Sequence, residues 1–175
     1  MSPKPLRDAE SVDFGARRSA QAKHAQRLVW PVNPALITRV GDTVTRDRNG
    51  LGRPHEGLDL FVPAGTEVVS AAPGRVEAVV DGRFSAKPRL RRAGLFVEVQ
   101  GAQGRRYRYL HLADVKVVEG MILGAGDLVG SVAPAHTSGL GEAPHLHFEV
   151  RSRALHGQSY GAPINPLTLL PSRRS

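Results

Sequence analysis

Residues Pro144–Val150, with the sequence PHLHFEV, form the stretch from which the fold of this chain can be predicted. Successive side chains of an extended strand point to opposite faces, so His145 and His147 share one face. The other face is apolar and carries Leu146, Phe148 and Val150. The pattern therefore predicts a strand anchored in a core, with two imidazoles about 7 Å apart at the backbone. Such a pair can serve a metal ion or proton transfer, and the spacing does not say which histidine would bind the metal.

Short β-prone runs continue this pattern on the N-terminal side of the histidine stretch. Examples are Leu58–Val62, Val76–Val80 and Leu95–Gln100, which are separated by turns rich in glycine and proline. Strands at intervals of about 8–12 residues with such punctuation are typical of an all-β protein. We therefore predict an all-β fold, a mostly antiparallel sheet of many short strands. The basic segment Gly82–Gly94 is predicted to be a solvated hairpin loop, with a contact surface for an anionic partner as the alternative.

The 175-residue chain is expected to contain one folded domain over residues 30–170. Residues 1–29 are expected to form a flexible or partly helical N-terminal segment, and residues 171–175 a basic tail. No apolar run approaches the ~20 residues needed to cross a bilayer, so the chain is not expected to be transmembrane. No secretory signal is visible before residue 30.

Composition narrows the chemistry and the partners. The chain has no cysteine, which excludes disulfides, thiolate ligands for zinc and a cysteine nucleophile. Its net charge of +8 indicates attraction to a polyanion. Specific nucleic-acid binding is not expected, because few aromatic residues lie among the arginines of Arg83–Arg92 and Arg105–Arg108, and no nucleic-acid motif is present.

A second element is His55-Glu56-Gly57-Leu58-Asp59. On a straight strand His55 and Asp59 would lie about 13 Å apart, too far to hold one ion. If both bind a metal, the backbone must bend, and Gly57 is the residue that would allow it. A helix with Glu56 as general base, as in zincins, is rejected, because Gly57 and the flanking residues oppose a helix.

A third element is Arg105–Leu112, in which strict alternation would place Tyr107, Tyr109 and His111 on one face. Together the three elements offer five metal-binding or proton-transfer groups. Two imidazoles and one carboxylate would leave one position of a tetrahedral site open, which is typical of a catalytic zinc centre. The two remaining histidines could then transfer protons or stabilise negative charge.

These motifs resemble those of a known family. The H-x-x-x-D of His55 and Asp59 lies inside HEGLDLFVPAGTEVVSAAPGRV, YLHL surrounds His111, and H-x-H lies inside PHLHFEVR. Their order and the turns between them are similar to those of the lysostaphin-type zinc metallopeptidases, also called LytM-domain peptidases. The resemblance covers roughly residues 30–170. Two segments depart from the usual pattern and are expected at the groove walls, where they would affect substrate preference, namely Gly82–Gly94 and His136–Ala143.

The resemblance implies an antiparallel β-sheet groove with one zinc ion on its floor. It implies His55, Asp59 and His147 as zinc ligands, with His111 and His145 lining the catalytic position. The implied activity is zinc-dependent endopeptidase hydrolysis of amide bonds in the peptide stems or cross-bridges of bacterial peptidoglycan. Which of His111 and His145 acts as general base is open.

The resemblance leaves one alternative function, a non-catalytic module on the same fold that binds the cell wall or regulates a hydrolase. The expected partners are peptidoglycan peptides and anionic cell-wall polymers. The expected location is the cell envelope, either periplasmic or secreted.

Overall fold

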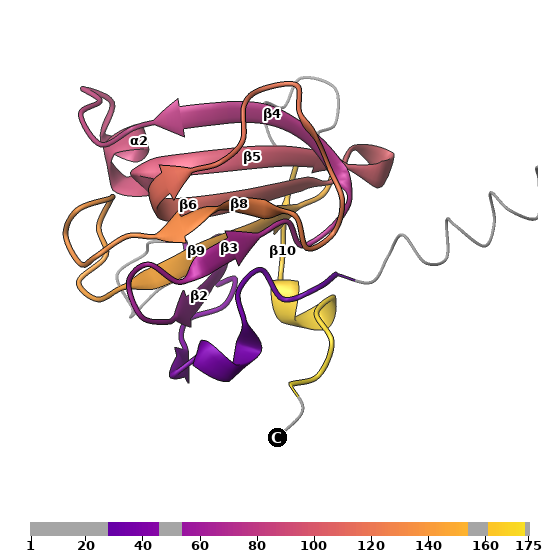
Figure 1. Cartoon of the computed structure of the whole chain (residues 1–175), viewed down its shortest axis with the longest axis horizontal. Helices are drawn as coiled ribbons and strands as arrows, with labels where there is room; N and C mark the ends of the chain where they lie inside the picture. The colour runs from indigo at the N-terminus through magenta and orange to yellow at the C-terminus, as the bar shows by residue number, and fades with distance from the viewer. Residues whose placement is uncertain (1–27, 46–53, 154–160, 174–175) are drawn as a thin grey trace, which may run out of the picture.

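The computed structural model describes residues 28–45, 54–153 and 161–173 (Figure 1). The segment predicted to be flexible or helical lies almost entirely outside these residues, as do the last two residues of the basic tail. The first described residues belong to the folded part, since Leu28 is buried and the Val29 amide donates a hydrogen bond to the Ala71 carbonyl.

Within the described residues, ten strands form one sheet with the order β1-β2-β9-β6-β5-β4-β7. Off this path, β10 pairs with β9, and β8 pairs with both β3 and β6. Every pairing is antiparallel, so the prediction of a mostly antiparallel all-β fold is confirmed. The strands are β1 (Arg39–Val40), β2 (Leu58–Phe61), β3 (Glu67–Val69), β4 (Gly74–Asp81), β5 (Leu95–Gly101), β6 (Arg106–Val115), β7 (Ile122–Leu123), β8 (Leu128–Val132), β9 (His145–Arg151) and β10 (Pro163–Ile164).

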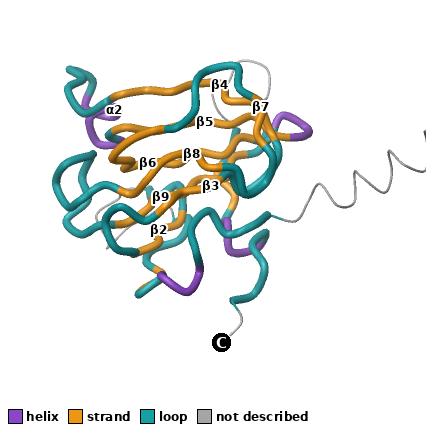
Figure 2. Tube along the Cα trace, viewed as in Figure 1, coloured by secondary structure: helices purple, strands orange, loops and turns teal. Residues whose placement is uncertain are grey.

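Helical structure is limited to short segments in the described part of the chain (Figure 2). Three are single 3₁₀ turns, η1 (Pro34–Leu36), η3 (Ala102–Gly104) and η4 (Pro166–Thr168), and the fourth is the α-helix α2 (Pro88–Ala93). Among these residues, no helix has both the length and the apolar character required to cross a membrane.

Helix α2 corrects the prediction that Gly82–Gly94 is a plain hairpin loop. Pro88 occupies the first turn, where its missing N–H costs no hydrogen bond, and Gly94 follows the helix with φ +71°. Arg91 and Arg92 lie in the last turn, where the helix dipole favours cations. A helix of six residues is too short to show a hydrophobic period, so the pattern of the sequence missed it.

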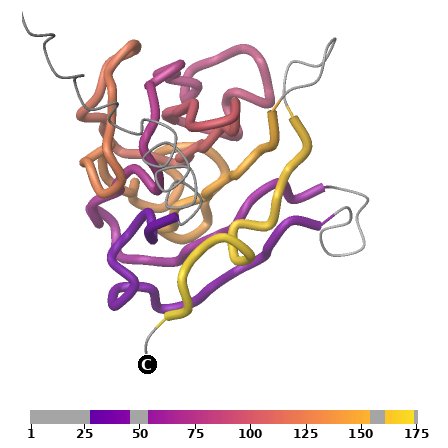
Figure 3. The backbone as a smooth tube through the Cα atoms, turned by 90° about the vertical axis from the view of Figure 1, so that its right-hand side faces the viewer, coloured from indigo at the N-terminus to yellow at the C-terminus, as the bar shows by residue number. Residues whose placement is uncertain are grey.

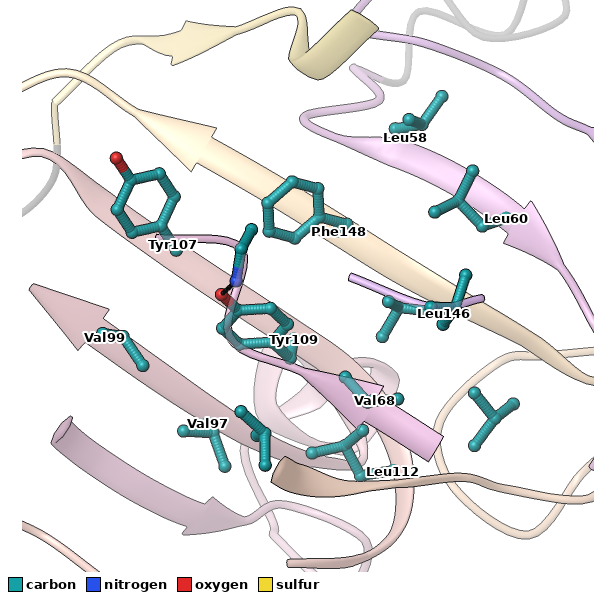
Figure 4. Close-up of a cluster of buried hydrophobic side chains, with 14 of the residues drawn as sticks. Leu58, Leu60, Val68, Val97, Val99, Tyr107, Tyr109, Leu112, Leu146 and Phe148 are labelled. Atoms are coloured by element: carbon teal, nitrogen blue, oxygen red, sulfur yellow. Dashed lines mark hydrogen bonds between the residues drawn. The ribbon is translucent and has the colours of Figure 1, made fainter. Parts of the chain in front are cut away.

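The main core lies on the apolar face of the long strands, covered by the shorter strands β3 and β8. Side chains from β2, β3, β5, β6 and β9 meet there (Figure 4). Leu146, Phe148 and Val150 are all fully buried in this core, which confirms the predicted alternation of β9. The Tyr109 hydroxyl reaches across the core and accepts a hydrogen bond from the Ala71 amide at 2.8 Å.

The two ends of the described chain lie side by side (Figure 3). The Trp30 indole N–H donates to the Pro171 carbonyl at 3.1 Å, and Arg173 donates to the carbonyl oxygens of Pro34 and Ile37. These contacts tie the C-terminal residues to the segment that leads into β1.

Candidate metal centre

Three side chains, two from the neighbouring strands β2 and β9 and one from just before β2, converge on the face of the sheet opposite the core. Asp59 of β2 and His147 of β9 are direct partners in the antiparallel ladder, so they share one face. His55 precedes β2 and is held by a bridge to Thr45, and the chain bends between it and Asp59. The structure thus brings His55 back over Asp59, as the metal hypothesis requires.

The donor atoms of these three residues form a small triangle. His147 Nδ1 lies 2.8 Å from Asp59 Oδ1, and His55 Nε2 lies 3.1 Å from the same oxygen. The two nitrogens are 3.2 Å apart. Ligands bound tetrahedrally to zinc at about 2.0–2.1 Å lie roughly 3.3 Å apart, so the spacing fits a single ion. In the described part of the chain this cluster has no fourth member, which leaves one position for water or substrate.

The second nitrogen of each histidine fixes which atom faces the cluster. His55 Nδ1 donates to the Thr43 carbonyl at 2.9 Å, so Nε2 is the ring nitrogen that faces the cluster. His147 Nε2 lies 3.3 Å from Glu149 Oε1, which leaves Nδ1 free to face Asp59. Such outer contacts are the usual means of orienting a metal-binding imidazole.

Glu149 is itself held by two guanidinium groups. Arg108 Nη1 and Arg151 Nε donate to its Oε2 at 2.9 and 2.7 Å. Arg151 also forms an ion pair with Glu56 at 2.6 Å. The Glu56 carboxylate is thus engaged by Arg151, which agrees with the rejection of Glu56 as a general base. Glu149 is a buried carboxylate, only 3% exposed, that the three sequence motifs did not single out. Its position two residues after His147 was the available signal, since it places both side chains on one strand face.

The site is strongly polarised. Burial would raise the pKa of Asp59, but hydrogen bonds from His147 and His55 outweigh it and hold the pKa well below its usual range. Burial would lower the pKa of His147, yet its hydrogen bonds to Asp59 and Glu149 raise it to about 9. Burial, together with neighbouring His147 and His145, lowers the pKa of His111 to about 3. His111 is therefore a neutral imidazole at pH 7.

The two remaining histidines lie beside the triangle. The His145 ring is 4.8 Å from the His111 ring between centroids, and His111 is 5.9 Å from His147. His145 Nδ1 donates to the Ala143 carbonyl at 2.8 Å, so its Nε2 is the nitrogen that faces the cluster, 3.8 Å from Asp59 Oδ1. Phe61 stacks on the His145 ring at 5.2 Å and holds its orientation. All five residues singled out from the sequence therefore lie together.

His111 reaches the site by a route that strict alternation does not predict. The prediction that it shares a face with Tyr107 and Tyr109 is wrong, since both tyrosines are buried in the core. Strand β6 carries one extra residue where Leu95 pairs with Leu112 and Val97 with Tyr109, and His111 has φ +64° there. This bulge turns His111 away from the core and toward the other histidines.

The chain bends at Gly57, as predicted, but the requirement for glycine there has another cause. The φ of Gly57 is not in the left-handed region, so backbone freedom is not what requires glycine. A Cβ at this position would lie 2.6 Å from the Phe148 carbonyl oxygen and 2.7 Å from His147 Nε2. Gly57 is therefore needed for the close approach of β2 and β9 behind the cluster.

A buried triangle of two imidazoles and a carboxylate on an antiparallel sheet, with two further histidines beside it, defines the class as a candidate metallohydrolase. The chain belongs to peptidase family M23, whose family model matches residues 53–166.

Relatives and solved structures agree with this assignment. An uncharacterised metalloprotease of Haemophilus influenzae is 33% identical over 126 residues, covering 70% of this chain and 22% of the relative. Peptidoglycan DD-endopeptidase ShyB of Vibrio cholerae is 31% identical over 113 residues, covering 63% of this chain and 24% of the relative. The chain thus spans about a quarter or less of the curated relatives it matches.

Two solved structures show the same fold. The catalytic domain of lysostaphin from Staphylococcus simulans superposes with a TM-score of 0.60 at 23% identity, covering 74% of this chain and 90% of that one. A zinc-containing peptidase from Vibrio cholerae gives a TM-score of 0.62 at 26% identity, covering 78% of this chain and 37% of that one.

Proposed function

We propose that this chain is a zinc-dependent endopeptidase that hydrolyses amide bonds in the peptide stems or cross-bridges of bacterial peptidoglycan. The observation that carries the proposal is the triangle of His55, Asp59 and His147, whose donor atoms lie 2.8–3.2 Å apart beside two further imidazoles. The printed name of the Vibrio relative, a peptidoglycan DD-endopeptidase, supports the substrate class. It also supports action outside the cytoplasm, in the cell envelope.

The three clustered residues would hold the metal, and the surrounding contacts prepare them for it. Thr43 and Glu149 fix the tautomers of His55 and His147, and the lowered pKa of Asp59 keeps its carboxylate ionised. A zinc ion held there would supply a Lewis acid that polarises the scissile carbonyl. Zinc is preferred because the donor set combines two imidazoles with one carboxylate and contains no thiolate.

His145 and His111 would act on the substrate. The Nε2 lone pair of His145 faces the cluster and can take a proton from an attacking water molecule. His111 is neutral and can stabilise the negative charge that develops on the carbonyl oxygen. In the alternative assignment, His111 takes the proton and His145 stabilises the charge.

The experiment measures zinc content by elemental analysis and loss of turbidity of purified cell-wall sacculi. His55→Ala, Asp59→Ala and His147→Ala are expected to lose zinc and activity together. His111→Ala is expected to keep zinc and lose about 10²–10⁴-fold in turnover. His24→Ala, outside all three motifs, is the control.

The alternative is a non-catalytic module that binds the wall or regulates a hydrolase. The complete set of three donor residues argues against it. Protein that contains stoichiometric zinc yet leaves sacculi intact would contradict the proposed activity. Mass spectrometry of fragments from defined muropeptides would identify the bond that is cut.

A further inference from the structure

A cleft lies beside the metal centre, between α2 and the loop that precedes β9. It has a volume of about 490 Å³ and is lined by three arginines, by His136 and by apolar Leu140 among others. Its lining contains no carboxylate. Both walls come from the segments in which the sequence departs from the family pattern. The surface is thus a concave and strongly basic one.

Some of the basic side chains of helix α2 line the cleft and others do not. Pro88, Arg91 and Arg92 line the cleft, and their spacing of i, i+3 and i+4 places them on one helical face. Arg89, on the same helix, does not line it. The cleft therefore receives two of the three arginines of α2.

The charges of Arg91 and Arg92 are not neutralised locally. Arg83, the third arginine of the lining, forms a two-pronged pair with Asp81 at 2.6 and 2.9 Å. Among the residues that the structure describes, neither Arg91 nor Arg92 forms an ion pair, and both side chains are exposed. Two guanidinium groups on a concave surface are suited to a carboxylate, which they can bind through paired hydrogen bonds.

The cleft and the metal centre share a wall. A Cβ on Gly139 would lie 2.4 Å from both His111 Nδ1 and the Arg92 carbonyl oxygen. The Leu140 amide donates to the same carbonyl at 3.3 Å, which joins the loop to α2. A peptide bound across the metal centre on the His111 side would therefore enter the cleft.

We infer that this cleft is a subsite that binds a carboxylate of the peptide substrate, through Arg91 and Arg92. The inference rests on the proposed function, because it assigns the cleft to the same substrate. The carboxylate belongs either to a side chain or to a free C-terminus of the peptide. A neutral or cationic group in its place is bound more weakly.

The competing explanation is structural, since Arg91 and Arg92 also lie at the C-terminal end of α2, where cations stabilise a helix. A structural role would change the melting temperature and would affect all substrates equally. The test therefore compares substrates that differ only in charge.

The test uses the zinc-loaded protein, the double variant Arg91→Ala/Arg92→Ala and the control Arg89→Ala. The substrates are cross-linked peptides with all carboxylates free, with only the side-chain carboxylates amidated, or with only the C-terminus amidated. For the free form, the double variant is expected to raise KM by about 10- to 100-fold with kcat little changed, because charge-assisted hydrogen bonds are lost. One amidated form is expected to show the same KM in wild type and double variant, which identifies the carboxylate.

Binding of an uncleaved single-stem peptide, followed by NMR titration, separates this inference from the proposed activity. Wild-type protein that binds the free peptide more tightly than the amidated one, yet cleaves nothing, would support the subsite and refute the endopeptidase. The subsite would be overturned if the double variant raised KM equally for the free and the amidated peptides. It would also be overturned if Arg89→Ala raised KM for the free peptide as much as the double variant does. Preference for a glycerol-phosphate oligomer over the free peptide would also overturn it, in favour of a phosphate polymer.

Discussion

Replacement of Gly57 by alanine tests whether the close packing of β2 against β9 sets up the metal centre. The added Cβ would lie 2.6 Å from the Phe148 carbonyl oxygen and 2.7 Å from His147 Nε2. Ordinary contacts begin near 3.4 Å, so the two groups must move away by about 0.8 and 0.7 Å. The first contact must push the Phe148 backbone away from its ladder partner Leu58, and the second must displace the His147 ring and its contact with Glu149.

These two displacements set the expected changes in stability and in metal affinity. Overpacking of this kind costs about 1–3 kcal/mol of unfolding free energy. Displacing the contact that orients a metal-binding histidine weakens metal affinity by about 10–100-fold. Urea unfolding in excess chelator measures the first effect, and competition with a chromophoric chelator measures the second.

Gly124→Ala is a matched control, because its Cβ would meet nothing closer than 3.5 Å and its φ is not in the left-handed region. It is expected to change neither quantity. The reasoning would be refuted if Gly57→Ala bound zinc as tightly as wild type and unfolded at the same urea concentration.

Three further predictions concern the same core and site. Tyr109→Phe leaves the buried Ala71 amide without its acceptor and is expected to lower the free energy of unfolding, measured with urea, by about 1–3 kcal/mol. The control Val69→Ala, at a half-buried position of the neighbouring strand β3, should lower it less. Glu149→Gln is expected to weaken zinc binding about 10–100-fold in chelator competition while the protein stays folded by circular dichroism; unchanged affinity would show that Glu149 does not orient His147. The pKa of His147 is raised to about 9 in the metal-free protein, so the stability it contributes is complete below about pH 6.5 and is lost as the pH rises through 9. Thermal unfolding of metal-free protein should show this fall, whereas zinc-loaded protein should not, because zinc replaces the proton on His147.

The sequence was sufficient for the parts of the fold that depend on alternation. Leu146, Phe148 and Val150 are apolar at every second position, so the buried face of β9 follows directly from the period of a strand. The rejection of a helix around His55 was also correct, because Gly57 and the β-prone residues after it continue into β2.

The sequence could not predict features that depend on one extra residue in a strand, or on a contact between residues far apart in the chain. Nothing in Arg105–Leu112 signals that β6 carries an extra residue, since the bulge is defined by its pairing with β5 and β8. The burial of Glu149 depends on Arg108, which is 41 positions away in the chain. The convergence of His55, Asp59 and His147 was implied by the family motifs, and no periodicity in the chain predicts it.

The bulge divides β6 into two halves. The core-facing residues have odd numbers in the first half and even numbers in the second. Residues before His111 face the interior at odd numbers, as Tyr107 and Tyr109 do, whereas Leu112 after it does so at an even number. A deletion of one residue between Tyr109 and Leu112 would remove the bulge, so that side chains alternate without interruption along β6. The left-handed backbone conformation at His111 would be lost. The imidazole would then be carried to the wrong side of the sheet, or Leu112 would leave the interior. Insertions and deletions in this short interval are therefore far more damaging than substitutions, although the interval contains no residue of the metal triangle.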